Sequence, residues 1–311
     1  MMAAARIDSE PPFVHASVML SEVLAAFGEL TEGVLVDVTL GGAGHSAALL
    51  GALPGVRLFG FDRDPRAVAA SRAVLAPFGE RAVVEHASFA EVAERLDAHG
   101  LARIDGILAD LGVSSEQLTD VSRGMSFRTP GPIDMRMDPS RGETARELIE
   151  RVSQEELADI IYELGEERAS RRIARCIKQA LAAERLTDTL ELRRAIVRAV
   201  GPRRVGGIDP ATRTFQALRM AVNAETSELR ALLALARQRL RSGGTAAFIS
   251  FHSIEDRAVK RELVGRNEWE PLTKKPRIPS DQEIEQNARS RSAKLRTARR
   301  LPPSGPGEEP E

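Results

Sequence analysis

Apolar positions along the first 115 residues alternate between short runs typical of strands and repeats typical of helices. The runs that predict strands cover 34–38, 56–61, 81–86 and 104–110. The repeats that predict helices lie between them, at 46–53, 65–77 and 89–99. Strands that alternate with helices of this length predict βαβ units around a parallel sheet.

The pattern changes in the middle of the chain and then returns. Residues 116–142 are irregular and contain Gly-Pro breakers, and 143–200 is helical throughout. Asp209 and Pro210 then predict the start of a helix that runs to about Arg241, followed by a strand over 246–251. A helical segment that interrupts an α/β sheet predicts an inserted domain. We therefore expect an α/β fold, a Rossmann-like mostly parallel sheet with an inserted all-helical domain.

These changes predict four parts of the chain. They are a first α/β part (1–120), an irregular segment with the helical domain (121–208), a second α/β part (209–275) and a basic C-terminal tail (276–311). The tail is rich first in Pro and then in Arg, so we expect it to be ordered only in part.

Composition excludes several classes of protein. The one cysteine, Cys176, excludes a disulfide framework and a cysteine-cluster metal site. No run approaches the roughly 18–20 apolar residues that span a bilayer, so we expect no membrane partner. The N-terminal MMAAARIDSEPPF lacks the apolar core of a secretory signal, which predicts a cytoplasmic protein.

The net charge of −1 hides a strong segregation of charge. Residues 143–167 hold nine acids against two arginines, whereas 168–204 holds eleven basic residues against three acids. Residues 257–300 hold thirteen basic residues against six acids. The two basic blocks are compatible with solvated helix faces and with a surface that contacts phosphates.

A glycine-rich turn follows the first predicted strand, in VLVDVTLGGAGHSAAL. Glycines at such a turn let the backbone approach a ligand, and Asp62, at the end of the second strand, can accept both ribose hydroxyls of a nucleoside. The turn nominally matches the G-x-G-x-x-A of dinucleotide sites, so a nicotinamide-dependent oxidoreductase is one alternative. Asp37 before the turn suits the cationic amino-acid end of S-adenosylmethionine better than a pyrophosphate. Tyr162 also lacks a lysine four residues on, so we favour the methyl donor.

Asp110 ends the fourth predicted strand, at the edge where open α/β sheets bind ligands. Methylation of an exocyclic amine needs a nitrogen lone pair aimed at the methyl group, and an acceptor that hydrogen-bonds the amine helps to localise that pair. Asp110 is thus a candidate catalytic residue. It could equally bind the adenine of the cofactor or cap the turn that follows.

Two later segments carry further candidates. In ATRTFQALRMAVN an apolar stripe predicts core, and a polar stripe of Thr212, Gln216, Arg219 and Asn223 lies beside it. In SFHSIEDR, His252 ends a strand, and Ser253 and Asp256 have the spacing of a capping box. We expect Arg213, Gln216 and His252 to contact the substrate.

Several segments of the chain closely resemble those of a known family, the bacterial 16S rRNA (cytosine-N4)-methyltransferases. This is the ribosomal RNA small subunit methyltransferase H family. The resemblance spans about residues 13–300 and is most specific in four of its motifs, DLGVSS, DMRMD, ATRTFQA and SFHSxEDR. The matching segments are HASVML (15–20), DVTLGGAGHS (37–46), GFDRDP (60–65), DGILADLGVSSEQL (105–118), DMRMDP (134–139), GEERASRRIAR (165–175), ATRTFQALRMAVN (211–223), SFHSIEDR (250–257) and RSAKLR (291–296).

The resemblance implies a class I methyltransferase domain with a helical insertion. It implies S-adenosylmethionine-dependent N4-methylation of a cytidine in the decoding centre of 16S rRNA, within the small ribosomal subunit, and no metal. The implied cofactor contacts are Ala43, Gly44, His45, Asp62, Phe89, Asp110 and Gln117. Phe89 and Gln117 come from the resemblance alone.

The chain departs from the family at three positions, namely Ala43 in place of a glycine, Met125 in place of a phenylalanine and Pro130 in place of an aspartate. Ala43 bears on the cofactor loop, whereas the other two bear on the irregular segment. Besides the oxidoreductase, a non-catalytic ribosome-assembly factor that retains the fold is an alternative.

Overall fold

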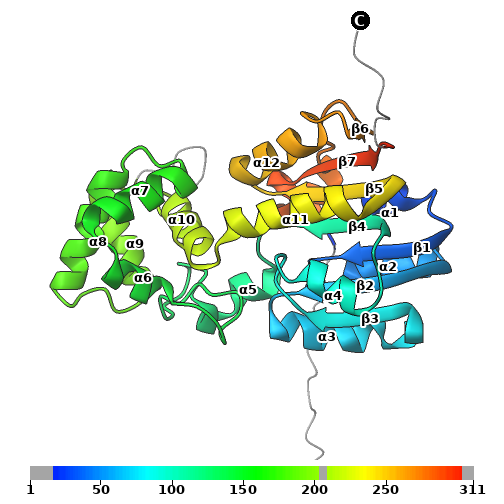
Figure 1. Ribbon diagram of the computed structural model, residues 1–311. Helices are drawn as coiled ribbons and strands as arrows, with labels where there is room; N and C mark the ends of the chain where they lie inside the picture. Colours follow the sequence, from blue (N-terminus) through cyan, green and yellow to red (C-terminus); the bar gives the residue numbers. More distant parts are fainter. Residues whose placement is uncertain (1–16, 203–208, 303–311) are drawn as a thin grey trace, which may run out of the picture.

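The computed structural model describes residues 17–202 and 209–302. The chain forms two lobes, an α/β lobe and a smaller helical lobe (Figure 1). The segments 1–16 and 203–208, which contain His15 and two arginines of the first basic block, lie outside the described residues.

The α/β lobe contains a seven-stranded sheet in the order β3-β2-β1-β4-β5-β7-β6. The strands are β1 Glu32–Asp37, β2 Gly55–Asp62, β3 Ala82–His86, β4 Ile104–Asp110, β5 Leu240–Ser250, β6 Trp269–Pro271 and β7 Lys294–Arg300. The first five pair in parallel, and β7 is antiparallel to both β5 and β6. This confirms the mostly parallel, Rossmann-like sheet, and its order is that of the class I methyltransferase fold.

Helices cover both faces of the sheet, so the lobe has three layers (Figure 1). One face packs on α4 Val92–Ala98, α11 Glu225–Arg239 and α12 Ser253–Leu263. The other face packs on α1 Leu20–Phe27, α2 Gly44–Ala52 and α3 Pro65–Leu75. The apolar runs of the strands are buried on both sides, as expected for parallel strands between two helical layers. Short elements complete the lobe, namely η1 Ala76–Arg81, α5 Ser115–Thr119, η2 Val121–Arg123, α13 Asp281–Gln286 and η3 Ala288–Ser292.

The helical lobe has its own apolar core. Its helices are α6 Ala145–Arg151, α7 Gln154–Gly165, α8 Ser170–Ala182, α9 Thr189–Val200 and α10 Thr212–Val222. The side chains of Ala211, Phe215 and Leu218 are buried in this core, so the predicted apolar stripe is confirmed there. The lobe therefore extends to the end of α10, beyond the predicted boundary at 208.

The single helix predicted from Asp209 to about Arg241 is wrong. The structure has two helices, α10 and α11, which are separated at Asn223 and Ala224. Ala224 has a left-handed backbone (φ 51°), which ends α10 and turns the chain back into the α/β lobe.

The basic tail (276–311), which we expected to be ordered only in part, forms β7 inside the sheet at 294–300. Leu295 and Ala298 are buried in the two cores, and Arg296 is only 8% exposed. The Arg296 guanidinium donates to Asp256 (2.7 Å), and the Lys294 ammonium lies 3.1 Å from the same carboxylate. The pairing with Asp256, about 40 residues earlier in the chain, lets the charge-rich segment 294–300 form a strand of the sheet. The local sequence pattern of 294–300 does not reveal this partner.

Candidate functional site

A cavity of about 430 Å³ lies at the carboxyl ends of β1, β2 and β4 and is called here the loop cavity. Its position is the one where open α/β sheets bind ligands. The structure brings six of the seven predicted cofactor residues to its wall, namely Gly44, His45, Asp62, Phe89, Asp110 and Gln117. The seventh, Ala43, does not line it.

The glycine-rich turn holds Ala43 in a left-handed conformation (φ 59°), a region that glycine adopts without steric cost. The methyl group of Ala43 is buried in the apolar core and does not face the loop cavity. A ligand in the cavity therefore does not meet that methyl group. At Gly44, in contrast, a Cβ would lie 2.2 Å from the Ser17 hydroxyl oxygen, so a side chain there would require that hydroxyl to rotate away.

Asp37 does not line the loop cavity, although its place before the turn suggested a contact with the methyl donor. Its side chain is 1% exposed and accepts hydrogen bonds from the Ser46 hydroxyl (2.6 Å) and the Thr39 amide (3.0 Å). The Thr39 hydroxyl in turn accepts a hydrogen bond from the Asp110 amide (2.6 Å). Asp37 thus shapes the turn and the end of β4.

Asp62 lies at the end of β2 with its carboxylate against the glycine loop. One oxygen accepts a hydrogen bond from the Gly41 amide (2.9 Å) and the other from the Asp64 amide (2.8 Å). Burial raises the pKa of Asp62 to about 6, although these two amides oppose the shift. A carboxylate has about four acceptor sites, so both oxygens retain capacity for ribose hydroxyls.

Gln117 is held by a buried network behind the loop cavity. Its amide oxygen accepts a hydrogen bond from the Ser114 amide (3.0 Å), which closes the capping box of α5, and its amide nitrogen donates to Asp64 (3.0 Å). Arg123, 3% exposed, donates to both oxygens of Asp64 (2.7 and 2.8 Å). This network attaches the irregular segment to the wall of the loop cavity.

Asp110 lies at the end of β4 with its carboxylate largely buried. Burial raises its pKa to about 6, and His45 partly offsets that effect. The His45 Nδ1 lies 4.0 Å from one carboxylate oxygen, while the other, Oδ1, is buried with no hydrogen-bond partner in the described chain. Since Ser114 caps α5, Asp110 is not the cap of the turn that follows it. A buried carboxylate oxygen without a partner indicates a group that meets a ligand.

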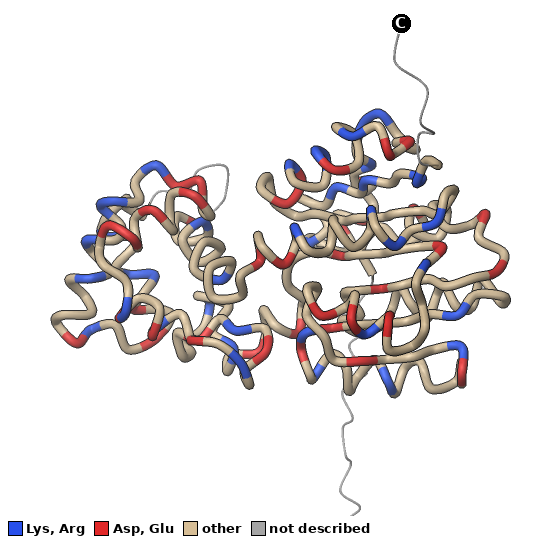
Figure 2. The backbone as a smooth tube through the Cα atoms, in the orientation of Figure 1, with Lys and Arg blue, Asp and Glu red and all other residues tan. Residues whose placement is uncertain are grey.

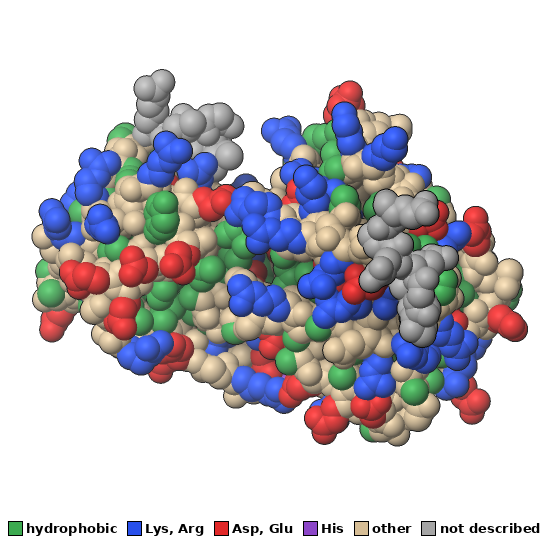
Figure 3. Space-filling model, turned by 45° about the horizontal axis from the view of Figure 1, so that its top comes forward, with side chains coloured by type: hydrophobic (Ala, Val, Ile, Leu, Met, Phe, Trp, Pro, Cys, Tyr) green, Lys and Arg blue, Asp and Glu red, His purple; other side chains and the backbone are tan. Residues whose placement is uncertain are grey.

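A second cavity, of about 340 Å³, lies between α11 and α12 and is called here the helix cavity. It shares five lining residues with the loop cavity, namely Arg63, Phe89, Leu111, Gly112 and Met137, so the two are neighbours. Apolar side chains line part of it, together with the arginines 63, 230, 257 and 261 and the glutamates 225, 228 and 255. Figure 3 shows Lys and Arg side chains on both sides of the hollow between the lobes.

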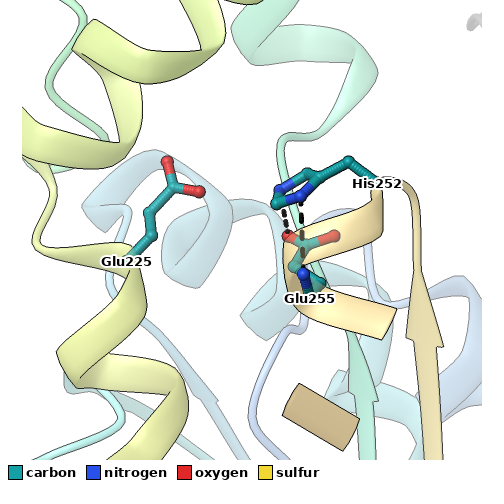
Figure 4. Close-up of side chains that lie close together, drawn as sticks. All are labelled: Glu225, His252 and Glu255. Atoms are coloured by element: carbon teal, nitrogen blue, oxygen red, sulfur yellow. Dashed lines mark hydrogen bonds and ion pairs between the residues drawn. The ribbon is translucent and has the colours of Figure 1, made fainter. Parts of the chain in front are cut away.

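Glu225, at the start of α11, faces His252 and Glu255 at the start of α12 (Figure 4). The His252 side chain is the N-cap of α12, and its Nε2 lies 3.1 Å from the Glu255 carboxylate. Burial raises the pKa of Glu255, but His252, the Phe251 amide and Arg219 outweigh it and lower the pKa overall.

Ligand atoms of Glu225, His252 and Glu255 lie within 4.8 Å of one another, a spacing that could hold a metal ion. Arg219 donates to both oxygens of Glu225 (2.7 and 2.8 Å), so a cation already balances that carboxylate.

The capping box considered for Ser253 and Asp256 is not formed, because His252 is the cap and Asp256 binds the strand β7. The Ser253 hydroxyl and the Arg257 guanidinium instead contact Glu166 of the helical lobe, each at 2.5 Å.

The three predicted substrate residues do not lie together on a cavity wall. Arg213 is exposed on α10 and donates to the Glu166 carbonyl (3.4 Å). Gln216 donates to the Leu164 carbonyl (3.5 Å) within the helical lobe. His252 lines neither the loop cavity nor the helix cavity.

The sequence reasoning missed Arg63, Glu225 and Glu255, which do line the helix cavity. Arg63 directly follows Asp62, and Glu255 lies inside the SFHSIEDR motif, but the local pattern does not mark either side chain as part of a cavity wall. Glu225 falls where the sequence predicted the middle of one long helix, and that error concealed it.

Comparisons with known proteins agree on one family. The model of the MraW methylase family matches residues 12–301. A protein of Sorangium cellulosum (strain So ce56), named ribosomal RNA small subunit methyltransferase H, is 60% identical over 287 residues, which are 92% of this chain and 91% of that protein. A protein of the same name from Synechococcus sp. (strain CC9902) is 49% identical and covers 94% of this chain and 99% of its own.

Among solved structures, a putative rRNA methylase from Clostridium thermocellum is similar at 12% identity and a TM-score of 0.44, over 93% of this chain and 100% of its own. In the described part of the chain, no helix is long and apolar enough to cross a membrane.

Proposed function

This chain belongs to the MraW methylase family, and from that premise we propose that it transfers a methyl group from S-adenosylmethionine to N4 of a cytidine in 16S rRNA. The proposed target lies in the decoding centre, and the proposed partner is the small ribosomal subunit in the cytoplasm. The printed names of the two relatives support small-subunit RNA as the substrate. The choice of N4 rests on the sequence resemblance and on Asp110.

The loop cavity fits the methyl donor. Asp62 offers free acceptor capacity at the end of β2, where a ribose is bound in folds of this type. The Asp110 oxygen that lies 4.0 Å from His45 offers a second acceptor to the donor, and the unpartnered oxygen is left for the target amine. Ala43 through its backbone, together with Gly44, His45, Asp62, Phe89, Asp110 and Gln117, would hold the donor. S-adenosylmethionine supplies an electrophilic methyl group on a positively charged sulfur.

The helix cavity fits an unstacked base. Its wall combines apolar side chains with carboxylates, and carboxylates accept hydrogen bonds from the exocyclic amine of cytosine. An enzyme that modifies a base removes it from the stack and holds it in such a pocket. Phe89 and Met137 line both cavities, so the base and the donor would meet there.

Asp110 is the residue that acts on the amine. Its ionised carboxylate accepts a hydrogen bond from N4, which localises the nitrogen lone pair and orients it toward the neighbouring cavity. The same carboxylate takes the proton that N4 loses as its new bond forms. A pKa of about 6 leaves Asp110 ionised at neutral pH and still basic enough for this transfer. The unpartnered Asp110 oxygen is the observation that carries the proposal.

Replacement of Asp110 by alanine tests this role. We expect D110A to lose methyl transfer to small-subunit RNA by at least about 100-fold, the usual contribution of a proton acceptor. The matched control D97A removes an exposed carboxylate on α4 that pairs with Arg239, and it retains activity. Unchanged transfer by D110A would contradict the proposed role.

Calorimetric titration with S-adenosylhomocysteine and with NADH separates the proposal from its alternatives. Binding of S-adenosylhomocysteine alone supports the methyltransferase, whereas binding of NADH alone would support the oxidoreductase. A protein that binds small subunits but neither of these two compounds would support the assembly factor.

A further inference from the structure

A third and smaller cavity, of about 90 Å³, lies where the two lobes meet. Its wall comes from the ends of β2 and β3, from the irregular segment and from the end of α10, and it includes three arginines, Arg63, Arg136 and Arg141. The liquid volume of one water molecule is about 30 Å³, so this small cavity holds a group of about three waters and not a nucleobase.

Two of the three arginines already have carboxylate partners. Arg136 donates to both oxygens of Asp134 (2.8 Å each), and Arg141 donates to Glu91 (2.8 Å). Asp138 also lines the small cavity, where His86 lies 3.2 Å away and Arg141 3.6 Å away from its carboxylate. The charges of these groups are therefore largely balanced within the protein.

Arg63 is different. No carboxylate within ion-pair distance is found for it in the described part of the chain, and the one hydrogen bond of its guanidinium there goes from Nη1 to the Asn223 carbonyl (2.9 Å). Its Nε is buried without a hydrogen-bond partner. A buried donor without an acceptor is costly, and a guanidinium matches the geometry of an oxyanion.

Arg63 also lines all three cavities, so its guanidinium stands between the proposed donor, the proposed base and the small cavity. A base that enters the helix cavity brings its own sugar-phosphate backbone to the junction of the lobes. The small cavity lies at that junction and has the size of a phosphate group.

We propose that Arg63 and the small cavity bind a phosphodiester group of the RNA beside the target nucleotide. This inference rests on the proposed function, because it takes RNA as the substrate. The chemistry that Arg63 recognises is an oxyanion, and the carboxylate of the methyl donor is the other source of one. The experiment below distinguishes the two sources.

The test measures RNA affinity at several salt concentrations, together with the affinity for S-adenosylhomocysteine, for wild type, R63Q, R63K and the control R72Q. Arg72 lies on α3, outside the three cavities. We expect R63Q to weaken RNA binding by roughly 10-fold and to reduce the slope of log affinity against log salt by about 0.7 to 1, the value for one lost phosphate contact. R63K retains the slope, and no variant changes the affinity for S-adenosylhomocysteine.

Two results would overturn the inference. One is a wild-type affinity and salt slope in R63Q, and the other is a loss of S-adenosylhomocysteine affinity with RNA binding unchanged, which would assign Arg63 to the methyl donor. Thermal unfolding serves as the control, because a midpoint temperature equal to that of wild type in R63Q and R63K shows that the fold is retained. Failure of the wild-type protein to bind or methylate RNA would instead contradict the proposed function itself.

Discussion

At the scale of single residues, two carboxyl groups of the loop cavity lower the free energy of unfolding when they are ionised. Burial raises the pKa of both Asp62 and Asp110 to about 6 from the usual 3.8. Between these pKa values the folded protein binds protons that the unfolded chain has lost. The contribution of each group to the free energy of unfolding therefore falls as pH rises from about 4 to 6. Residues arranged for ligand binding thus reduce stability at neutral pH, as active sites often do.

Asp110→Asn should separate stability from activity. The shift from 3.8 to about 6 would correspond to roughly 3 kcal/mol, and exposure of a quarter of the side chain reduces this to about 1–2 kcal/mol. We expect D110N to unfold at a higher denaturant concentration than wild type at pH 7.5 while its methyl transfer falls by at least about 100-fold.

The same comparison at pH 4 is the control. There Asp110 is protonated in the folded wild type, so the stability advantage of D110N should disappear. An advantage of equal size at both pH values, or none at pH 7.5, would be inconsistent with a raised pKa for Asp110.

Sequence reasoning reached some of these residues and not others, for a physical reason. Gly44, Asp62 and Asp110 stand at strand ends, and a strand end has a predictable place in a parallel sheet. Asp37 has the same kind of position, yet Ser46 and Thr39 satisfy its carboxylate. Arg63 stands out only because its guanidinium has no carboxylate partner in the described chain. Whether such a partner exists depends on residues far apart in the sequence, which a local pattern does not show.

At the scale of elements, the irregular segment is attached to the cofactor edge through one buried ion pair. Arg123 and Asp64 are each 4% exposed at the side chain. Asp64 also caps α3, binds Gln117 and donates its amide to Asp62. The polar stripe of α10 has a related role, since the Asn223 amide bonds the backbone of Met135 and Met137 (2.7 and 2.8 Å). The ion pair thus joins the irregular segment to the site, and Asn223 joins the helical lobe to that segment.

Arg123→Ala should damage both the fold and the donor site. Removal of one partner leaves the other charge buried, which costs about 3–5 kcal/mol. We expect R123A to lower the free energy of unfolding by about that amount and to weaken binding of S-adenosylhomocysteine, because Gln117 and Asp62 lose their support.

Chemical denaturation and calorimetry measure the two effects. Arg128→Ala serves as the control, since Arg128 is exposed in the same irregular segment. R123A with wild-type stability and ligand affinity would show that the ion pair does not support the site.

At the scale of the whole molecule, the net charge of −1 conceals how charge is distributed. Both lobes carry basic and acidic positions (Figure 2). The predicted basic block at 257–300 divides in space. Arg257 and Arg261 line the helix cavity, whereas Lys294 and Arg296 on β7 bind Asp256 of α12. A sum along the sequence cannot separate arginines that hold the fold from those that face a cavity.

The architecture itself was largely predictable. Apolar runs located β1 to β5, and the loss of strand pattern after residue 142 located the helical lobe. The errors fall where long-range contacts override local pattern. Asp256 brings the arginine-rich β7 into the sheet, and the left-handed Ala224 divides a predicted helix in two.

Nucleoside mass analysis tests the central claim most directly. The purified protein is incubated with small-subunit RNA or assembled subunits from cells that lack it, together with S-adenosylmethionine labelled in its methyl group. The RNA is then digested to nucleosides. The account predicts label in N4-methylcytidine, and its loss with D110A. Label in any other nucleoside, or no transfer to RNA by a protein that binds S-adenosylhomocysteine, would contradict it.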